Sequence, residues 1–189
     1  MKKKTNKTVN LSSFSNSEWN IGASKFKQLL WLICSFLFFQ NPLFIFYKPK
    51  QILLKIFGAK IGLNLIIKPS VKIKFPWKLI IGDNCWIGED VWIDNLDYVR
   101  ISNNVCISQG AYLLTGNHNY NKEQFDLITK PIIIKNGVWI AAKSILLPGS
   151  ICLENSIVGV GCVFGGKAEI NMIYQNQKPS SVKKRKIKF

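Results

Sequence analysis

The sequence is poor in histidine and in carboxylates. It has one histidine, His118, and 10 Asp and Glu residues against 26 Lys and Arg, which gives a formal net charge of +16. A single imidazole excludes a zinc centre built on three histidines, so we expect no metal. The five cysteines form no CxxC pair and are odd in number. We therefore expect reduced core thiols rather than a disulfide framework, and a cytoplasmic protein.

Part of the positive charge is concentrated at the two ends of the chain. Lys2–Lys4 and Lys183–Lys188 together hold seven lysines and one arginine, which is half of the excess. The charge fits an ordinary solvated surface, or attraction to acidic glycans, anionic lipid or the phosphates of a cofactor. Because the aromatic residues are not interleaved with a basic stripe, we expect no nucleic-acid partner.

An uninterrupted apolar run long enough to cross a bilayer is also lacking. Residues 28–47 are strongly apolar, but a polar break at 40–42 divides them, and no signal-peptide cleavage site follows. We expect a flexible polar N-terminus over residues 1–24. The apolar helical segment 25–60 is expected to cap the rest of the chain, because a stretch that is apolar on all sides must be buried somewhere.

Two helices are predicted inside this segment, Phe26–Phe39 and Lys50–Phe57, the second ending at Gly58. Our preferred interpretation is that they cover the open end of a β-structure, which otherwise exposes unpaired strand edges. The alternative is an interfacial helix that lies on a membrane, with its lysines against anionic lipid. Those lysines are Lys25, Lys27, Lys48, Lys50 and Lys55.

What the sequence does contain is an apolar repeat with a period of six residues. Its steps open with Ile61, Ile67, Ile73, Ile81, Ile87, Ile93, Ile101, Ile107, Leu113, Ile134, Ile140, Leu146, Cys152 and Val158. Four residues after most openers comes a second residue, usually small or β-branched: Leu65, Val71, Cys85, Val91, Val105, Ala111, Val138, Ser144, Ser150, Ser156 and Cys162.

A fixed short period is typical of a parallel β-helix, in which three steps make one triangular coil. A sandwich would instead show turn signals roughly every eight to twelve residues. We therefore predict an all-β protein with a parallel β-helix of about five triangular coils over residues 61–163. Residues 164–189 form a C-terminal extension with a basic tail.

The repeat is interrupted three times, each time after the third step of a coil. The steps that start at Ile73 and Ile93 are eight residues long, and the step that starts at Leu113 is 21 residues long. All three expansions therefore fall on one corner of the prism, from which a loop of residues 114–133 projects. His118 lies at the mouth of this loop. Long loops on a rigid scaffold are disproportionately functional, so we expect the chemistry here.

Four segments resemble one known family: Phe57–Gly62 (FGAKIG), Ile81–Asn95 (IGDNCWIGEDVWIDN), Ile107–Tyr112 (ISQGAY) and Thr115–Tyr120 (TGNHNY). They are similar to the colanic acid biosynthesis acetyltransferases, which belong to the hexapeptide-repeat O-acetyltransferases. The resemblance implies a left-handed β-helix, an exception to the usual right-handed crossover. It also implies acetyl-CoA as the acetyl donor and a homotrimer with its active sites between subunits.

His118 is the predicted general base, because a sugar hydroxyl must lose its proton to attack a thioester and imidazole titrates near neutral pH. Direct transfer between two bound substrates needs no Ser or Cys nucleophile. The preceding coil supplies Asn95 and Asp97 as candidates to orient the imidazole, although both residue types also favour turns. The predicted acceptor-binding residues are Asp94, Asn117 and Asn119.

The donor site is predicted from the later coils. The stretch Asn136–Lys143 (NGVWIAAK) resembles the cofactor-side motif of the family. The resemblance implies that Trp139 borders the pantetheine channel and that the backbone amides of Ala141 and Ala142 face the thioester, where they could bind an oxyanion. Relatives have Gly at the first of these positions and some have Ser at the second, so only a backbone role is available to this chain.

Further along, the resemblance implies that the pantetheine arm passes close to Gly159 and Gly161. It also implies that Lys167 lies near the CoA phosphates.

The sequence thus predicts an O-acetyltransferase that modifies a sugar hydroxyl of a cell-surface or exopolysaccharide precursor. We expect it in the cytoplasm, free or at the inner face of the membrane. Two alternatives stay open at this point. One is an acyltransferase for an amino sugar or another small acceptor. The other is a non-catalytic β-helix that binds acidic glycan or a membrane surface.

Overall fold

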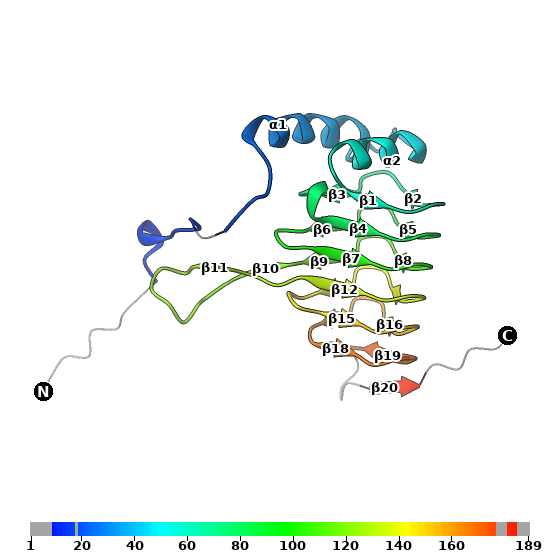
Figure 1. Ribbon diagram of the computed structural model, residues 1–189. Coiled ribbons are helices and arrows are strands. Elements are labelled where there is room, and N and C mark those ends of the chain that lie inside the picture. Colours follow the sequence, from blue (N-terminus) through cyan, green and yellow to red (C-terminus); the bar gives the residue numbers. More distant parts are fainter. Residues whose placement is uncertain (1–8, 18, 177–180, 185–189) are drawn as a thin grey trace, which may run out of the picture.

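The computed structural model describes residues 9–17, 19–176 and 181–184, the last four by their backbone alone. Lys2–Lys4 and most of the basic C-terminal tail lie outside these residues. The chain forms a parallel β-helix of triangular cross-section, closed at one end by two helices (Figure 1). The predicted fold class is confirmed.

Three sheets form the sides of the prism, and the chain visits them in turn. Sheet A contains β1 (Lys60–Ile61), β4 (Leu79–Ile81), β7 (Val99–Ile101), β12 (Ile132–Ile134), β15 (Ile151–Cys152) and β18 (Lys167–Ala168). Sheet B contains β2 (Ile66–Ile67), β5 (Trp86–Ile87), β8 (Cys106–Ile107), β13 (Trp139–Ile140), β16 (Ile157–Val158), β19 (Met172–Gln175) and β20 (Ser181–Lys184). Sheet C contains β3 (Lys72–Ile73), β6 (Trp92–Asp94), β9 (Tyr112–Leu114), β14 (Ile145–Leu146) and β17 (Val163–Phe164). Neighbouring strands pair in parallel, except that β20 runs antiparallel to β19.

The six-residue repeat accounts for the interior. Thirteen of the fourteen openers are buried, and Ile61 in the first turn is half-buried. The eleven residues that come four positions after an opener, from Leu65 to Cys162, are all buried as well. Each coil lies about 4.8 Å from the next through strand pairing, so the core is a narrow column of short side chains.

The coils continue past residue 163, which makes six turns rather than about five. Phe164 pairs with Leu146 and follows Val158 by six residues, so it continues the repeat. The next inward residue is Ala168, which pairs with Cys152 after a step of only four residues. Gly166, at φ +94°, allows this short turn because it has no Cβ. We predicted that the β-helix ends at residue 163 because a six-residue period does not include a four-residue step.

The corners between sheets A and B and between sheets B and C are regular. In each coil they contain one residue with φ near +60°, such as Asn64, Asn84 and Asn104 in the A–B corner. Asparagine tolerates this left-handed conformation better than most residues. The side chains also stack, since Nδ2 of Asn64 donates to Oδ1 of Asn84 at 2.9 Å. The corner between sheets C and A (the C–A corner) varies in length from coil to coil.

Helix α1 (Lys25–Cys34) continues into the π-helical segment η2 (Ser35–Phe39), and α2 (Tyr47–Ile56) follows. The first prediction is confirmed within one residue, whereas α2 begins three residues earlier than predicted. Pro49 lies in its first turn, where a backbone N–H is not needed. The short 3₁₀ turns are η1 (Leu11–Ser13) and η3 (Pro76–Lys78).

The two helices close the first coil by hydrogen bonds as well as by packing. Trp31 Nε1 donates to the carbonyl of Ile73 at 2.9 Å, and Lys50 Nζ donates to that of Lys68 at 3.0 Å. Both carbonyls belong to the first coil, where no earlier coil pairs with them. The buried side chains of Trp31, Phe39 and Leu54 join the core below. No helix in the described part of the chain has the length and apolar character needed to cross a membrane.

Candidate active site

The longest C–A connection forms an antiparallel ribbon that projects from the side of the prism (Figure 1). Its strands are β10 (Gly116–His118) and β11 (Leu127–Thr129), and His118 pairs with Leu127. The base of the ribbon is fixed by Thr115, which is fully buried and donates its hydroxyl to the carbonyl of Asp94 at 2.8 Å. The predicted loop 114–133 is therefore an ordered support for His118.

The imidazole of His118 is held on one side by Phe125. The Nδ1 atom lies 2.9 Å from the carbonyl oxygen of Phe125, and the two rings stack with centroids 4.4 Å apart and planes 5° apart. A carbonyl oxygen can only accept, so the neutral ring carries its proton on Nδ1. The lone pair is then on Nε2, which is the arrangement that a general base requires.

Phe125 itself has an uncommon backbone conformation, with φ at +53°. A bulky residue in the left-handed region is an outlier that costs of order 1–3 kcal/mol and is retained where the surrounding structure enforces it. Here the conformation coincides with a carbonyl directed at Nδ1 and a ring directed at the imidazole. The backbone of Phe125 therefore determines the orientation of His118.

His118 lines an open cavity of about 550 Å³ between the ribbon and the next two coils. The predicted residues Asn117 and Asn119 line it too, and Asn117 Oδ1 accepts from the backbone N–H of His118 at 2.8 Å. The other lining residues were not predicted: Leu114, Tyr120, Asn121, Ile128, Lys130, Leu147, Pro148 and Gly165. The repeat could have indicated Leu147, since β14 pairs with β9 and places it beside Leu114.

The preceding coil does not orient the imidazole, and this corrects the prediction. Asn95 is fully buried, and its side chain bonds the backbone N–H and carbonyl of Phe75 at 2.9 and 2.6 Å. The Oδ1 atom of Asp97 accepts from the N–H of Tyr98 at 2.6 Å. Both side chains stabilise turns, and the partner of His118 Nδ1 is the carbonyl of Phe125.

Asp94 belongs to a separate polar cluster on the outer face of sheet C. Its carboxylate pairs with Lys74 at 2.9 Å and accepts from the hydroxyl of Tyr112 at 3.2 Å. Burial, followed by the charge of Asp94, raises the pKa of Tyr112 to about 12. None of these three residues lines the cavity of His118.

The predicted donor residues are spread over two sheets. Trp139 is exposed on sheet B, with Nε1 donating to the hydroxyl of Ser108 at 2.8 Å, and Ala142 and Gly161 lie in the adjoining B–C corner. Lys167 lies on sheet A and pairs with Glu169 at 3.1 Å. The structure therefore separates Lys167 from the other donor candidates.

One backbone role is also corrected. The N–H of Ala141 donates to the carbonyl of Val158 at 2.8 Å within the sheet, so it is not free to bind an oxyanion. At Gly159 a Cβ would lie 2.9 Å from the carbonyl oxygen of Tyr174 in the last coil, and its place beside the pantetheine arm stays a prediction. By contrast, Gly161 has open space on its Cβ side, and the amide of Ala142 has no acceptor among the described residues.

Cysteine and metal chemistry find no support at this site. Burial raises the pKa of Cys152 to about 12 and also raises the pKa of Cys85 and Cys162, so these thiols stay protonated and unreactive. Within the described residues, no group of three or more His, Cys, Asp or Glu side chains could hold a metal ion.

The sequence matches no protein-family model. It is 38% identical over 150 residues to the colanic acid biosynthesis acetyltransferase WcaF of Escherichia coli, covering 79% of this chain and 82% of that protein. It is 28% identical over 119 residues to the galactoside O-acetyltransferase of Escherichia coli, covering 61% and 59% of the two chains.

Solved structures show the same fold at lower identity. A hexapeptide-repeat acetyltransferase of Vibrio cholerae in complex with acetyl coenzyme A has a TM-score of 0.72 at 20% identity, covering 88% of this chain and 92% of that one. A maltose O-acetyltransferase of Clostridium difficile has a TM-score of 0.71 at 19% identity, covering 86% and 88%. With its repeat, its ribbon and its likeness to WcaF, the chain belongs to the family of the colanic acid biosynthesis acetyltransferases.

Proposed function

We propose that this protein transfers an acetyl group from acetyl-CoA to a hydroxyl of a sugar in a polysaccharide precursor, with His118 as the general base. The observation that carries the proposal is the bond between His118 Nδ1 and the Phe125 carbonyl beside an open cavity. The names of the related acetyltransferases support the reaction and the class of acceptor.

The chain's own residues have two tasks in this reaction: they transfer a proton and they hold the acceptor. Nε2 of His118 accepts the proton of the sugar hydroxyl as the oxygen attacks, and it returns that proton to the departing sulfur. Polar side chains at the cavity, those of Asn117, Asn119 and Tyr120, bind neighbouring hydroxyls and hold the acceptor in line. Acetyl-CoA, when bound, supplies the activated carbonyl carbon and a thiolate leaving group.

Sheet B and its corner fit the donor. Trp139 offers an exposed aromatic surface, Gly161 leaves room for an extended arm, and the amide of Ala142 can donate to a carbonyl oxygen. Trp139 lies on sheet B and the other two in the B–C corner, whereas His118 lies at the C–A corner, and none of the three lines its cavity. We therefore propose that a second copy supplies the donor surface, as in a homotrimer with sites between subunits.

Purified protein tests the reaction directly. Release of the CoA thiol from acetyl-CoA is measured with nucleotide sugars, lipid-linked saccharides and amino sugars as acceptors, and the product is examined for an ester or an amide. An alkali-labile ester on a sugar supports the proposal. An amide product supports the alternative of an amino-sugar acyltransferase, and glycan binding without transfer supports a binding module.

Mixed subunits test the shared site. A His118→Ala chain and a Trp139→Ala chain are each expected to be nearly inactive. If each site uses His118 from one chain and Trp139 from another, unfolding the two variants together and refolding them at equal amounts restores about a quarter of wild-type activity. A site contained in a single chain gives no recovery. Lys122→Gln, at an exposed position on the ribbon outside the cavity, serves as the control.

A further inference from the structure

The outer surface of the helical cap, residues 25–60, is unusually apolar. Of the 27 large hydrophobic side chains that are exposed in the described part of the chain, 13 lie between residues 26 and 56. They are Phe26, Leu29, Leu30, Leu32, Ile33, Phe36, Leu37, Leu43, Ile45, Phe46, Tyr47, Ile52 and Ile56. Contiguous exposed apolar surface of this kind marks an interaction site.

Helical spacing explains why so much of this surface stays outside. Along α1 and η2 the buried positions are Trp31, Ser35 and Phe39, four residues apart, so one narrow stripe packs on the prism. Cys34 and Phe38 are partly buried beside this stripe. The exposed side of the two segments is apolar, with Phe26, Leu29, Leu30, Leu32, Ile33, Phe36 and Leu37. α1 lies across the end of the stack (Figure 1), so its outward face and the turn at residues 42–46 are presented at the end of the molecule.

The charge around this surface has one sign. From residue 19 to residue 82 the sequence has ten lysines and no aspartate or glutamate. Lys25, Lys48 and Lys55 are exposed on the cap. Lys50 is buried, and its burial lowers its pKa to about 8, while the Lys27 ammonium lies over the Trp77 ring. Three of the five lysines that we expected at a lipid surface are thus exposed and can contact anionic headgroups.

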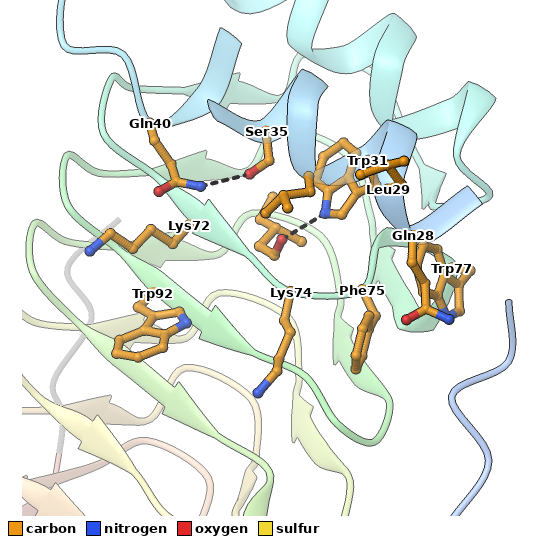
Figure 2. A pocket seen from close by; sticks show the side chains of 12 residues that line it. Gln28, Leu29, Trp31, Ser35, Gln40, Lys72, Lys74, Phe75, Trp77 and Trp92 are labelled. Carbon is orange, nitrogen blue, oxygen red and sulfur yellow. Dashed lines mark hydrogen bonds between the residues drawn. The ribbon is translucent and has the colours of Figure 1, made fainter. Parts of the chain in front are cut away.

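The apolar surface continues into a cavity of about 470 Å³ between α1 and the first strands of sheet C (Figure 2). Leu29 and Leu32 of α1 form one wall, and Trp92 lies on the opposite side. Lys72 and Lys74 also line it; Lys74 pairs with Asp94, whereas the Lys72 ammonium lies over Trp92 at 5.6 Å. Apolar walls beside a lysine fit an acyl chain and an anionic headgroup.

We infer that the helical cap docks this protein on the surface of a bilayer that contains anionic lipid. An apolar face that enters the interface, flanked by lysines, is the pattern of an interfacial helix, and each lysine near an anionic surface adds attraction. A protein partner would need a surface that is both apolar and acidic. The inference does not depend on the acetyl-transfer reaction.

Flotation of the full-length protein with vesicles tests this inference. Wild-type protein is expected to float with vesicles of phosphatidylcholine and phosphatidylglycerol, and to float much less with phosphatidylcholine alone or at high salt. The variant Phe36→Gln, Leu43→Gln, Phe46→Gln changes side chains that are 68%, 86% and 62% exposed. It is expected to lose about tenfold or more of its vesicle binding.

The matched control changes exposed apolar residues at the far end of the prism, Val160→Gln with Ile170→Gln, and should bind like wild type. The inference is overturned if wild-type protein stays off anionic vesicles at low salt, or if the triple variant binds them equally well. It is also overturned if the cap joins copies of the protein instead: light scattering would then show an assembly that the triple variant dissolves, with no vesicle binding.

Discussion

The regular corners of the prism and the C–A corner follow different rules. The A–B and B–C corners turn in nearly the same way in every coil, with one left-handed residue each and a direct bond between successive coils. The C–A corner has steps of four, six, eight and 21 residues. The longest C–A connection projects from the stack as the ribbon of β10 and β11, and it carries His118.

The largest effect is expected at the longest C–A connection. His118→Gln keeps a polar side chain but removes the base, so kcat should fall by roughly 10² to 10⁴. The thermal unfolding midpoint should stay near that of the wild type, because the ring is half-buried and packs mainly on Phe125. Steady-state kinetics and calorimetry on the same samples check both parts. Full turnover in this variant would remove His118 from the mechanism.

The next effect concerns stability at a regular corner. A Cβ at Gly88 would lie 2.6 Å from the backbone nitrogen of Gln109 in the next coil, which cannot move without breaking the stack. Gly88→Ala should therefore lower the free energy of unfolding by about 2–3 kcal/mol.

The matched change at the C–A corner is Gly165→Ala, whose Cβ would meet the Leu147 side chain and no backbone atom, with Leu147 Cδ1 nearest at 3.2 Å. It should cost less than about 1 kcal/mol. Denaturant titration measures both variants. Equal losses would mean that the two kinds of corner are equally constrained.

A smaller effect is expected at Phe125, which acts on His118 through position. Phe125→Ala removes the stacked ring but keeps the carbonyl, so kcat should fall by about tenfold, the upper range for one aromatic pair. The KM for acetyl-CoA should not change, because Phe125 does not lie on the proposed donor surface. Phe125→Tyr should restore activity. A rise in KM without a change in kcat would argue for a role in binding instead.

The smallest effect compares two inward serines, one at each kind of corner. The hydroxyl of Ser156, at an A–B corner, is buried and finds no hydrogen-bond partner among the residues that the structure describes, so Ser156→Ala should stabilise the protein by about 1 kcal/mol. The hydroxyl of Ser150, at a C–A corner, donates to the carbonyl of Leu147 at 2.6 Å. Ser150→Ala should destabilise by a similar amount. Thermal unfolding of both variants measures the two changes in stability. If both variants gain stability, or both lose it, the predicted difference between the two corners is wrong.

The sequence predicted the regular parts well, because a period of six leaves little freedom. All eleven residues predicted to point inward four positions after an opener are buried. The ribbon starts where the longest step of the repeat was found. The last turn was missed because Gly165 and Gly166 shorten a step that the repeat takes as six residues.

The details of the site were harder to predict, since they depend on the backbone rather than on residue type. Nothing in the identity of Phe125 indicates that its carbonyl faces an imidazole, because that depends on a φ of +53°. Asn95 and Asp97 have the right chemistry to orient a histidine, but their side chains are used by neighbouring backbone groups. Ala141 resembles a donor-site residue, yet its amide belongs to the ladder of sheet B.

The separation between the ribbon and sheet B has a consequence for how this enzyme family can diversify. Residues added or removed at the C–A corner leave the stacking of the other two corners unchanged, as the steps of four to 21 residues in one chain demonstrate. If the ribbon binds the acceptor and sheet B the donor, as we propose, acceptor preference can change by exchanging one loop while the donor surface is kept. Grafting a relative's ribbon onto this scaffold and measuring which sugars are acetylated tests this.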